Sequence, residues 1–362
     1  MRVEEKVYTD GKDYFSNLFQ SLENAKSEIL IESYIYQRGE LSKKLLLILK
    51  DASSRNVQIK IIVDAAGSYG ETNELFEFCV ANKIEAKLYH PILWTDLINT
   101  FKFLNRRNHR KTIIVDRRIA YTGSLNISDV HVLEKTAWKD YGVSIVGEGV
   151  QELCVAFDKI FQKKRLNKII QNVIFKRETN TPSSGVYLND TSLKRKECYL
   201  NLLNNIQKSK KRLWIANAYI LPEFKIQKHL EKAAARGVDV RILSSSHRSD
   251  IFFMPWITTL VYKRSLHFGI KIYEYLPSFF HGKVFVFDDY ISIGSSNLNH
   301  RSLLHDLEVD VVLSKNENKA LLELDLERCF SLSQALTKSD IQRIPSWQGV
   351  IAKIFYLFKY WF

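Results

Sequence analysis

The sequence predicts an α/β fold of two similar halves, each a mixed β-sheet flanked by helices. Apolar, β-branched segments alternate with helical segments along the chain, which is the pattern of a layered sheet-and-helix fold. The same order of segments then occurs a second time, which indicates a duplication. The length of 362 residues suits two domains, each large enough for its own core.

The expected elements follow one another in the same order in both halves. The first half offers a helix at 13–25, a strand at 26–36, a helix and a strand within 41–64, and a strand at 86–90. The second half offers a helix at 194–208, a strand at 210–220, a helix and a strand within 226–245, and a strand at 270–275. Gly237 suits the end of its helix, because glycine readily adopts the left-handed conformation there.

The boundary between the halves is expected where the chain becomes polar and rich in turn formers. Val186 then begins a segment that repeats the strand near Val7. We therefore predict a first half at 1–176, a linker at 177–185, a second half at 186–335 and a C-terminal tail at 336–362.

The most informative pattern occurs once in each half, where a strand begins. Both copies read H-x-K-x4-D followed by G-S-x-N. A histidine and a lysine two positions apart on a strand point the same way. Two such strands packed face to face would form one site for a phosphate. The residues are His109, Lys111, Asp116, Ser124 and Asn126 in the first copy, and His281, Lys283, Asp288, Ser295 and Asn297 in the second.

These residue types can cleave a phosphodiester without metal or cofactor. The two lysines would bind the non-bridging oxygens, with the two asparagines and the neighbouring serines contacting the substrate. One histidine would attack phosphorus to form a phosphohistidine, and the other would protonate the leaving group. An attacking histidine needs an acceptor for its second ring nitrogen, and Asp140 and Glu308 are the candidates. Asp116 and Asp288 complete the catalytic motif, but we expect them to anchor the strand-turn.

The paired H-x-K-x4-D with G-S-x-N resembles the phospholipase D superfamily over roughly residues 7–335. Stretches such as IIVDAAGS and GSSNLNHRSLLHDLE resemble bacterial cardiolipin synthases of the short type without N-terminal transmembrane helices. The resemblance implies two phospholipase D-like halves with the active site at their pseudo-twofold interface. It implies transfer of a phosphatidyl group from one phosphatidylglycerol to a second, with release of glycerol. It makes His109 and His281 the nucleophile and acid/base pair, and we predict His109 as the nucleophile.

Two alternatives to this function remain open. The same chemistry would hydrolyse a phosphodiester in phospholipid or nucleic acid if water were the acceptor. A catalytically silent binding module is the other alternative, and intact His, Lys and Asn residues in both copies argue against it.

Charge and apolar segments indicate a membrane surface as partner. The net charge of +13 favours an anionic partner, either acidic lipid headgroups or nucleic acid. No signal peptide or stretch of ~20 apolar residues is evident, so we expect the protein to be peripheral on the cytoplasmic face of the cell membrane. Because one chain holds both motifs, we expect a monomer. The segments 252–257 and 347–362 are rich in large apolar residues and would contact either lipid or the protein core.

Several other residues carry weaker expectations. The four scattered cysteines indicate reduced thiols, without a disulfide or zinc framework. The basic run at 106–111 would help to steer an anionic substrate towards His109. Tyr34, Tyr36 and Tyr219 are expected in the core, and most of the histidines outside the motifs are expected to be structural.

Overall fold

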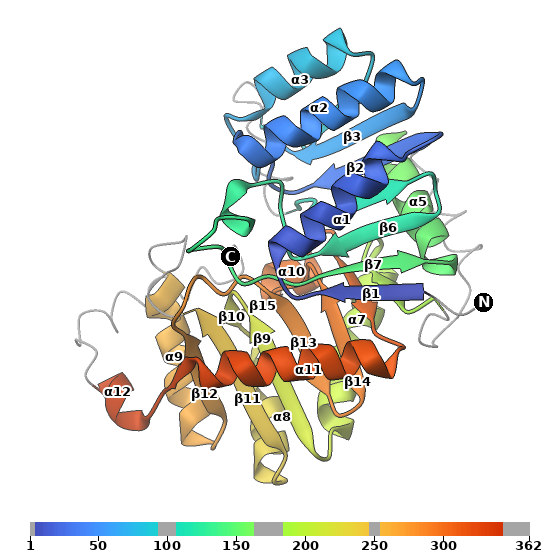
Figure 1. The fold of residues 1–362 in the computed structure, drawn as a ribbon. Coiled ribbons are helices and arrows are strands. Elements are labelled where there is room, and N and C mark those ends of the chain that lie inside the picture. Colours follow the sequence, from blue (N-terminus) through green and yellow to red (C-terminus); the bar gives the residue numbers. More distant parts are fainter. Residues whose placement is uncertain (1–3, 93–105, 163–183, 246–253, 343–362) are drawn as a thin grey trace.

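The computed structural model describes residues 4–92, 106–162, 184–245 and 254–342, and shows two halves that each contain a mixed sheet flanked by helices (Figure 1). The predicted fold class is confirmed. In the first sheet, β2, β3 and β4 are parallel and the other neighbours are antiparallel. The strands in spatial order are β1 (Glu4–Tyr8), β7 (Gly142–Val146), β6 (Ile119–Gly123), β5 (Thr112–Val115), β2 (Glu28–Ser33), β3 (Gln58–Asp64) and β4 (Glu85–Tyr89).

The second sheet repeats this arrangement with one additional edge strand, β17. Its parallel strands are β9, β11 and β12, and the motif strand β13 lies between β9 and β14 as β5 lies between β2 and β6. The spatial order is β17 (Ser333–Ala335), β12 (Lys271–Tyr275), β11 (Asp239–Ser245), β9 (Arg212–Asn217), β13 (Lys283–Phe287), β14 (Tyr290–Gly294), β16 (Val309–Val312) and β8 (Val186–Leu188). A separate parallel pair consists of β10 (Ile220–Leu221) and β15 (Leu298–Asn299).

Helices cover both sheets, and four of them lie where helices were expected, at 13–25, within 41–64, at 194–208 and within 226–245. The first half has α1 (Gly11–Glu23), α2 (Glu40–Ser54), α3 (Thr72–Ala81), the short 3-10 turn η1 (Asp129–His131) and α5 (Glu148–Phe161). The second half has α7 (Ser192–Lys208), α8 (Phe224–Ala235), α9 (Met254–His267), α10 (His300–Leu304), α11 (Asn316–Ser331) and α12 (Lys338–Gln342). None of the helices in the described ranges is long and apolar enough to cross a membrane.

Three hydrophobic clusters hold these layers together. One lies within the first half and includes residues of α1 and α2. A second lies within the second half and includes residues of α8 and α9. The third joins the halves, because residues of β7, β13 and β16 contribute to it together with Phe157 of α5 and Phe330 of α11. The motif strands β5 and β13 are buried along their whole length, as expected for strands covered on both faces.

Only part of the predicted linker and part of one of the two apolar segments lie within the described residues. Most of the predicted linker and all of 347–362 lie outside the described residues. Leu336 and Ile341 pack against the core of the second half, so the beginning of the predicted tail contacts protein. Met254 and Ile257, within the segment 252–257, are buried in α9 and are not membrane contacts. All four cysteines are free, and Cys79, Cys154 and Cys329 are buried.

Candidate active site

Backbone hydrogen bonds bring the two motif histidines to the contact between the halves. The N–H of His109 donates to the carbonyl of Leu307 at 3.0 Å, and the N–H of His281 donates to the carbonyl of Lys139 at 2.9 Å. Each bond lies beside an isolated parallel bridge, one between Asn108 and Leu307 and the other between Lys139 and Phe280. The first residue of each motif is therefore fixed by the backbone of the other half.

The side chains of the two histidines are paired across the halves in the same way. Nδ1 of His109 lies 3.0 Å from both carboxylate oxygens of Glu308. Nδ1 of His281 lies 2.7 Å from Oδ1 of Asp140. Each imidazole comes from one half and its carboxylate from the other, so neither half contains a complete histidine–carboxylate pair. Such an acceptor at Nδ1 leaves Nε2 available to act as a nucleophile or to exchange a proton.

Two buried lysines lie beside the histidines. Nζ of Lys111 donates to the carbonyl of His109 at 2.7 Å, and Nζ of Lys283 donates to the carbonyl of His281 at 2.6 Å. Nζ of Lys283 is also 3.1 Å from Nε2 of His281. Burial and the charge of Lys283 hold the pKa of Lys111 well below its usual range. An anionic phosphodiester between the two lysines would favour their charged forms, because opposite charges stabilise one another.

The pKa values of the histidines indicate neutral imidazoles before substrate binds. Burial, followed by the charges of Lys111 and Lys283, holds the pKa of His109 well below its usual range. Burial and Lys283 lower the pKa of His281 to about 3, against the opposing effect of Asp140. A neutral imidazole whose Nδ1 carries the proton has a lone pair on Nε2, which nucleophilic attack requires.

The two carboxylates differ in ionisation. Burial raises the pKa of Glu308 to about 7, although Lys111 and the hydroxyls of Ser295 and Ser302 oppose the shift. Burial also opposes ionisation of Asp140, but contacts with His281 and His131 outweigh it and hold its pKa well below the usual range. Asp140 is therefore an anion at neutral pH, whereas Glu308 titrates near neutrality.

The serines of the two G-S-x-N segments hold the carboxylates and do not face a substrate. Oγ of Ser124 donates to Oδ1 of Asp140 at 2.6 Å, and Oγ of Ser295 donates to Oε2 of Glu308. Both serines are fully buried. We therefore replace the substrate contact expected from the sequence with a positioning role for Ser124 and Ser295.

The asparagines remain candidates for contacting phosphate. Oδ1 of Asn126 accepts a weak hydrogen bond from the backbone of Ile35 at 3.4 Å, and Oδ1 of Asn297 has no partner among the described residues. Their backbone N–H groups are occupied: Asn126 donates to Nε2 of His131, and Asn297 donates to Oγ of Ser302.

The motif aspartates lie at the far ends of their strands, away from the histidines. Asp116 accepts hydrogen bonds from the backbone of Lys26, Ser27 and Glu28, and Asp288 accepts from the backbone of residues 210–212. Their φ angles of 52° and 51° lie in the left-handed region, which aspartate tolerates better than most residues. This geometry supports an anchoring role at the turn and gives neither aspartate a part in the chemistry.

Two residues that contact the paired carboxylates were not predicted from the sequence. His131 contacts Asp140 and Ser302 contacts Glu308, yet neither was singled out as part of the site. Their common position, five residues after each G-S-x-N asparagine, is the signal that could have revealed them.

The expectation that the whole basic run steers substrate is wrong, because two of its arginines are buried inside the protein. Arg107 lies near Asp64 at 3.8 Å and Arg110 lies near Glu32 at 3.7 Å. Tyr34 is more than a core residue: its ring lies 4.6 Å from that of His109 and 5.0 Å from Nζ of Lys111.

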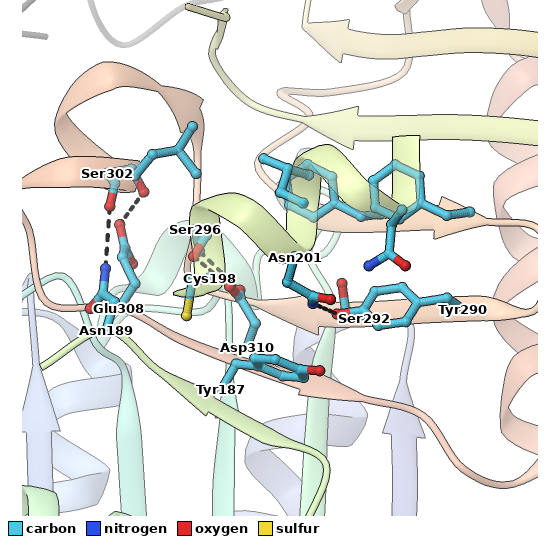
Figure 2. Close-up of a pocket in the computed structure, with 15 residues that line it drawn as sticks. Tyr187, Asn189, Cys198, Asn201, Tyr290, Ser292, Ser296, Ser302, Glu308 and Asp310 are labelled. Atoms are coloured by element: carbon cyan, nitrogen blue, oxygen red, sulfur yellow. Dashed lines mark hydrogen bonds between the residues drawn. The ribbon is translucent and has the colours of Figure 1, made fainter. Parts of the chain in front are cut away.

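A cavity of about 60 Å³, lined by apolar and polar side chains, lies beside Glu308 between α7 and the second sheet (Figure 2). Asp310 of β16 lines it together with Glu308, which directly precedes that strand. Burial raises the pKa of Asp310 to about 7, although the hydroxyl of Ser296, which donates at 2.6 Å, opposes the shift. The cavity therefore places a second titratable carboxylate beside Glu308.

His131, Asp140 and His281 form a group that could in principle hold a metal ion, since their ligand atoms lie within 4.8 Å of one another. Hydrogen bonds join these atoms, however. Nδ1 of His131 is 2.7 Å from Oδ2 of Asp140, and Nδ1 of His281 is 2.7 Å from Oδ1. A metal at this place would have to displace both imidazole protons.

The chain is similar in sequence to proteins named cardiolipin synthase. The chain is 29% identical over 336 residues to a cardiolipin synthase of Geobacillus sp. (strain WCH70), which covers 90% of this chain and 66% of that protein. It is 28% identical over 350 residues to a cardiolipin synthase of Staphylococcus aureus (strain Mu50 / ATCC 700699), covering 94% of this chain and 70% of that protein. The chain thus spans about two thirds of the length of these relatives.

A solved structure and a family description identify the fold and the family. The crystal structure of phosphatidylserine synthase from Haemophilus influenzae Rd KW20 has a TM-score of 0.71 at 12% identity, covering 98% of this chain and 93% of that one, and so shares the fold. The family described as "Cardiolipin synthase, PLD-like domain" matches residues 18–164 and 202–330. This match confirms the predicted resemblance: the chain belongs to the phospholipase D-like family of cardiolipin synthases.

Proposed function

We propose that this protein is a phosphatidyltransferase that forms cardiolipin from two molecules of phosphatidylglycerol. The observation that carries the proposal is the cross-pairing of His109 with Glu308 and of His281 with Asp140, beside two buried lysines. The names of the relatives, cardiolipin synthases of Geobacillus and Staphylococcus, support the substrate class.

In the first step, Nε2 of His109 attacks the phosphorus of one phosphatidylglycerol. A P–N bond forms and the P–O bond to glycerol breaks. His281 must be an imidazolium at this point, a form that the bound anionic phosphodiester and Asp140 favour, and it supplies the proton that the leaving alkoxide needs. Lys111, Lys283, Asn126 and Asn297 stabilise the charge on the non-bridging oxygens. Tyr34 lies against His109 and limits the directions from which phosphorus can approach.

In the second step, the primary hydroxyl of the glycerol headgroup of another phosphatidylglycerol attacks the phosphohistidine. His281 accepts the hydroxyl proton, a new P–O bond forms, and the P–N bond breaks to regenerate His109. The protons balance over the cycle, because His281 regains in this step the proton that it gave to glycerol. Neither step needs a metal ion, so activity should persist in EDTA.

The protein would act as a peripheral monomer on the cytoplasmic face of the membrane. A pocket of about 450 Å³ between α9 and α12 supports contact with anionic lipid, since it combines apolar and basic side chains: Leu260, Leu266, Ile341, Lys263, Arg264, His267 and Lys338. The aromatic segment 347–362 would add to this contact.

Deletion of residues 347–362 should weaken cosedimentation of the protein with phosphatidylglycerol vesicles. Unchanged cosedimentation would contradict a membrane role for this segment.

The deciding experiment gives the purified protein phosphatidylglycerol vesicles and identifies products by mass spectrometry, with and without EDTA. Cardiolipin and glycerol in equal amounts are expected. Phosphatidic acid without cardiolipin would replace transfer by hydrolysis, and cleavage of DNA without action on lipid would make the protein a nuclease.

A further inference from the structure

The residue five positions after the asparagine of each G-S-x-N segment contacts the catalytic carboxylate, but its identity differs between the halves. In the first half it is His131, whose Nδ1 lies 2.7 Å from Oδ2 of Asp140. In the second half it is Ser302, whose hydroxyl donates to Oε1 of Glu308. His131 is 1% exposed, so its imidazole has been removed from water to make this contact.

The hydrogen bonds of His131 determine its tautomer. The backbone N–H of Asn126 donates to Nε2 of His131 at 3.1 Å, so Nε2 must carry a lone pair. In the neutral imidazole, Nδ1 therefore carries the proton and donates it to Asp140. Oδ1 of the same carboxylate accepts from Ser124 at 2.6 Å and contacts Nδ1 of His281 at 2.7 Å. Both oxygens of Asp140 are thus occupied, and its side chain is fixed in rotation.

We propose that His131 is a positioning residue for His281, acting by fixing Asp140 as an oriented anion that holds His281 ready for proton transfer. This inference rests on the proposed function, in which His281 alternates between imidazole and imidazolium. The imidazolium needs a permanent anion at Nδ1, since Lys283 lies 3.1 Å from its Nε2. The pKa of Asp140, held well below its usual range by His281 and His131 despite burial, agrees with this role.

Two substitutions separate the contacts that His131 makes. The amide nitrogen of asparagine reaches as far from Cβ as Nδ1 of histidine, whereas the amide of glutamine reaches as far as Nε2. His131→Asn therefore keeps the donor to Asp140 and loses the acceptor for Asn126. His131→Gln keeps the acceptor for Asn126 and loses the donor to Asp140. Each variant gives up one hydrogen bond, so each serves as a folding control for the other.

The expected results differ for rate but not for folding. With phosphatidylglycerol vesicles, His131→Gln should lower kcat about 10- to 100-fold with little change in KM, and His131→Asn should stay within about threefold of the wild type. Both should melt at similar temperatures. Equal kcat losses in the two variants would show a merely structural role, and wild-type kcat in both would show no role; either result overturns the proposal.

A substrate that needs no general acid tests the mechanism of the effect. The 4-nitrophenolate group of phosphatidyl-4-nitrophenol leaves without a proton, so the pre-steady-state burst of His131→Gln should match that of the wild type while its turnover falls. A burst lost in step with turnover would overturn a role through His281 as acid. Activity of the wild type that EDTA abolishes and Zn²⁺ restores would overturn it in favour of metal binding by His131.

These outcomes are separate from the fate of the proposed function. If the wild type releases 4-nitrophenolate but forms no cardiolipin, phosphatidyl transfer to phosphatidylglycerol fails as the function. The comparison of His131→Asn with His131→Gln can still be made in the hydrolysis of phosphatidylglycerol, where His281 serves the same acid role.

Discussion

The two histidine–carboxylate pairs share one plan and differ in what supports the carboxylate. Asp140 is held by the imidazole of His131 and the hydroxyl of Ser124, whereas Glu308 is held by two serine hydroxyls. Glu308 also has Asp310 in the cavity beside it. The result is a carboxylate of depressed pKa beside His281 and one with a pKa of about 7 beside His109.

This difference matches two different tasks. A histidine that donates and accepts a proton in each cycle becomes an imidazolium, which a permanent anion stabilises. A nucleophilic histidine needs its Nδ1 proton accepted and its Nε2 lone pair free while it attacks. The asymmetry therefore favours His281 as the acid/base and His109 as the nucleophile.

The strongest test of this comparison removes each histidine in turn. His109→Ala and His281→Ala should each lower cardiolipin formation by roughly 10⁴-fold or more, since residues that act together are each indispensable. With phosphatidyl-4-nitrophenol, His281→Ala should retain a burst of 4-nitrophenolate and His109→Ala should not. A burst that survives only in His109→Ala would reverse the assignment of the two roles.

Removing the charge of each carboxylate should have the next largest effect. Asp140→Asn and Glu308→Gln should lower kcat about 10²- to 10⁴-fold, because an amide cannot accept the Nδ1 proton as strongly and can impose the wrong tautomer. The measurement is kcat on phosphatidylglycerol vesicles at neutral pH, with circular dichroism as the folding control. Wild-type kcat in either folded variant would show that the paired carboxylate is not needed.

The pH dependence should report Glu308 and not Asp140. Burial raises the pKa of Glu308 to about 7, so lowering the pH through this value protonates Glu308 and removes the acceptor for His109. We expect kcat/KM for cardiolipin formation to fall about tenfold per pH unit on the acidic side.

Asp140 should remain ionised over the same pH range, because its pKa is depressed. The acidic limb should therefore disappear from the residual activity of Glu308→Gln. If kcat/KM of the wild type declined only at the ordinary pKa of a glutamate, and not near pH 7, the assignment to Glu308 would be refuted.

The smallest effect on rate is expected at the motif aspartates, where the two halves behave alike. Asp116→Asn and Asp288→Asn weaken hydrogen bonds to the backbone of the neighbouring strand, so each should lower the free energy of unfolding by about 1–2 kcal/mol. Their kcat at a temperature well below unfolding should stay within about threefold of the wild type. Urea denaturation and steady-state kinetics measure the two quantities, and a large kcat loss without destabilisation would return the aspartates to the catalytic machinery.

The sequence predicted the elements around the site well, because local patterns determine them. The burial of β5 and β13 follows from their continuous apolar runs. The positions of Asp116 and Asp288 in the turn follow from the fixed spacing of the motif and from the left-handed conformation that aspartate accepts. The residue between histidine and lysine in each motif was less predictable. In the second motif it is Gly282, because a Cβ there would lie 2.5 Å from the ring of Tyr141. In the first motif it is Arg110, which is buried near Glu32.

The sequence by itself determined the two motifs, the repeated order of elements and the kind of chemistry, because these depend on residues close together along the chain. Only the tertiary structure decided which carboxylate serves which histidine, since His109 and Glu308 are 199 residues apart and His281 and Asp140 are 141 apart. It also decided that Ser124 and Ser295 hold carboxylates and that His131 and Ser302 belong to the site. Contacts of this kind depend on how the halves pack against one another, and no local periodicity encodes that packing.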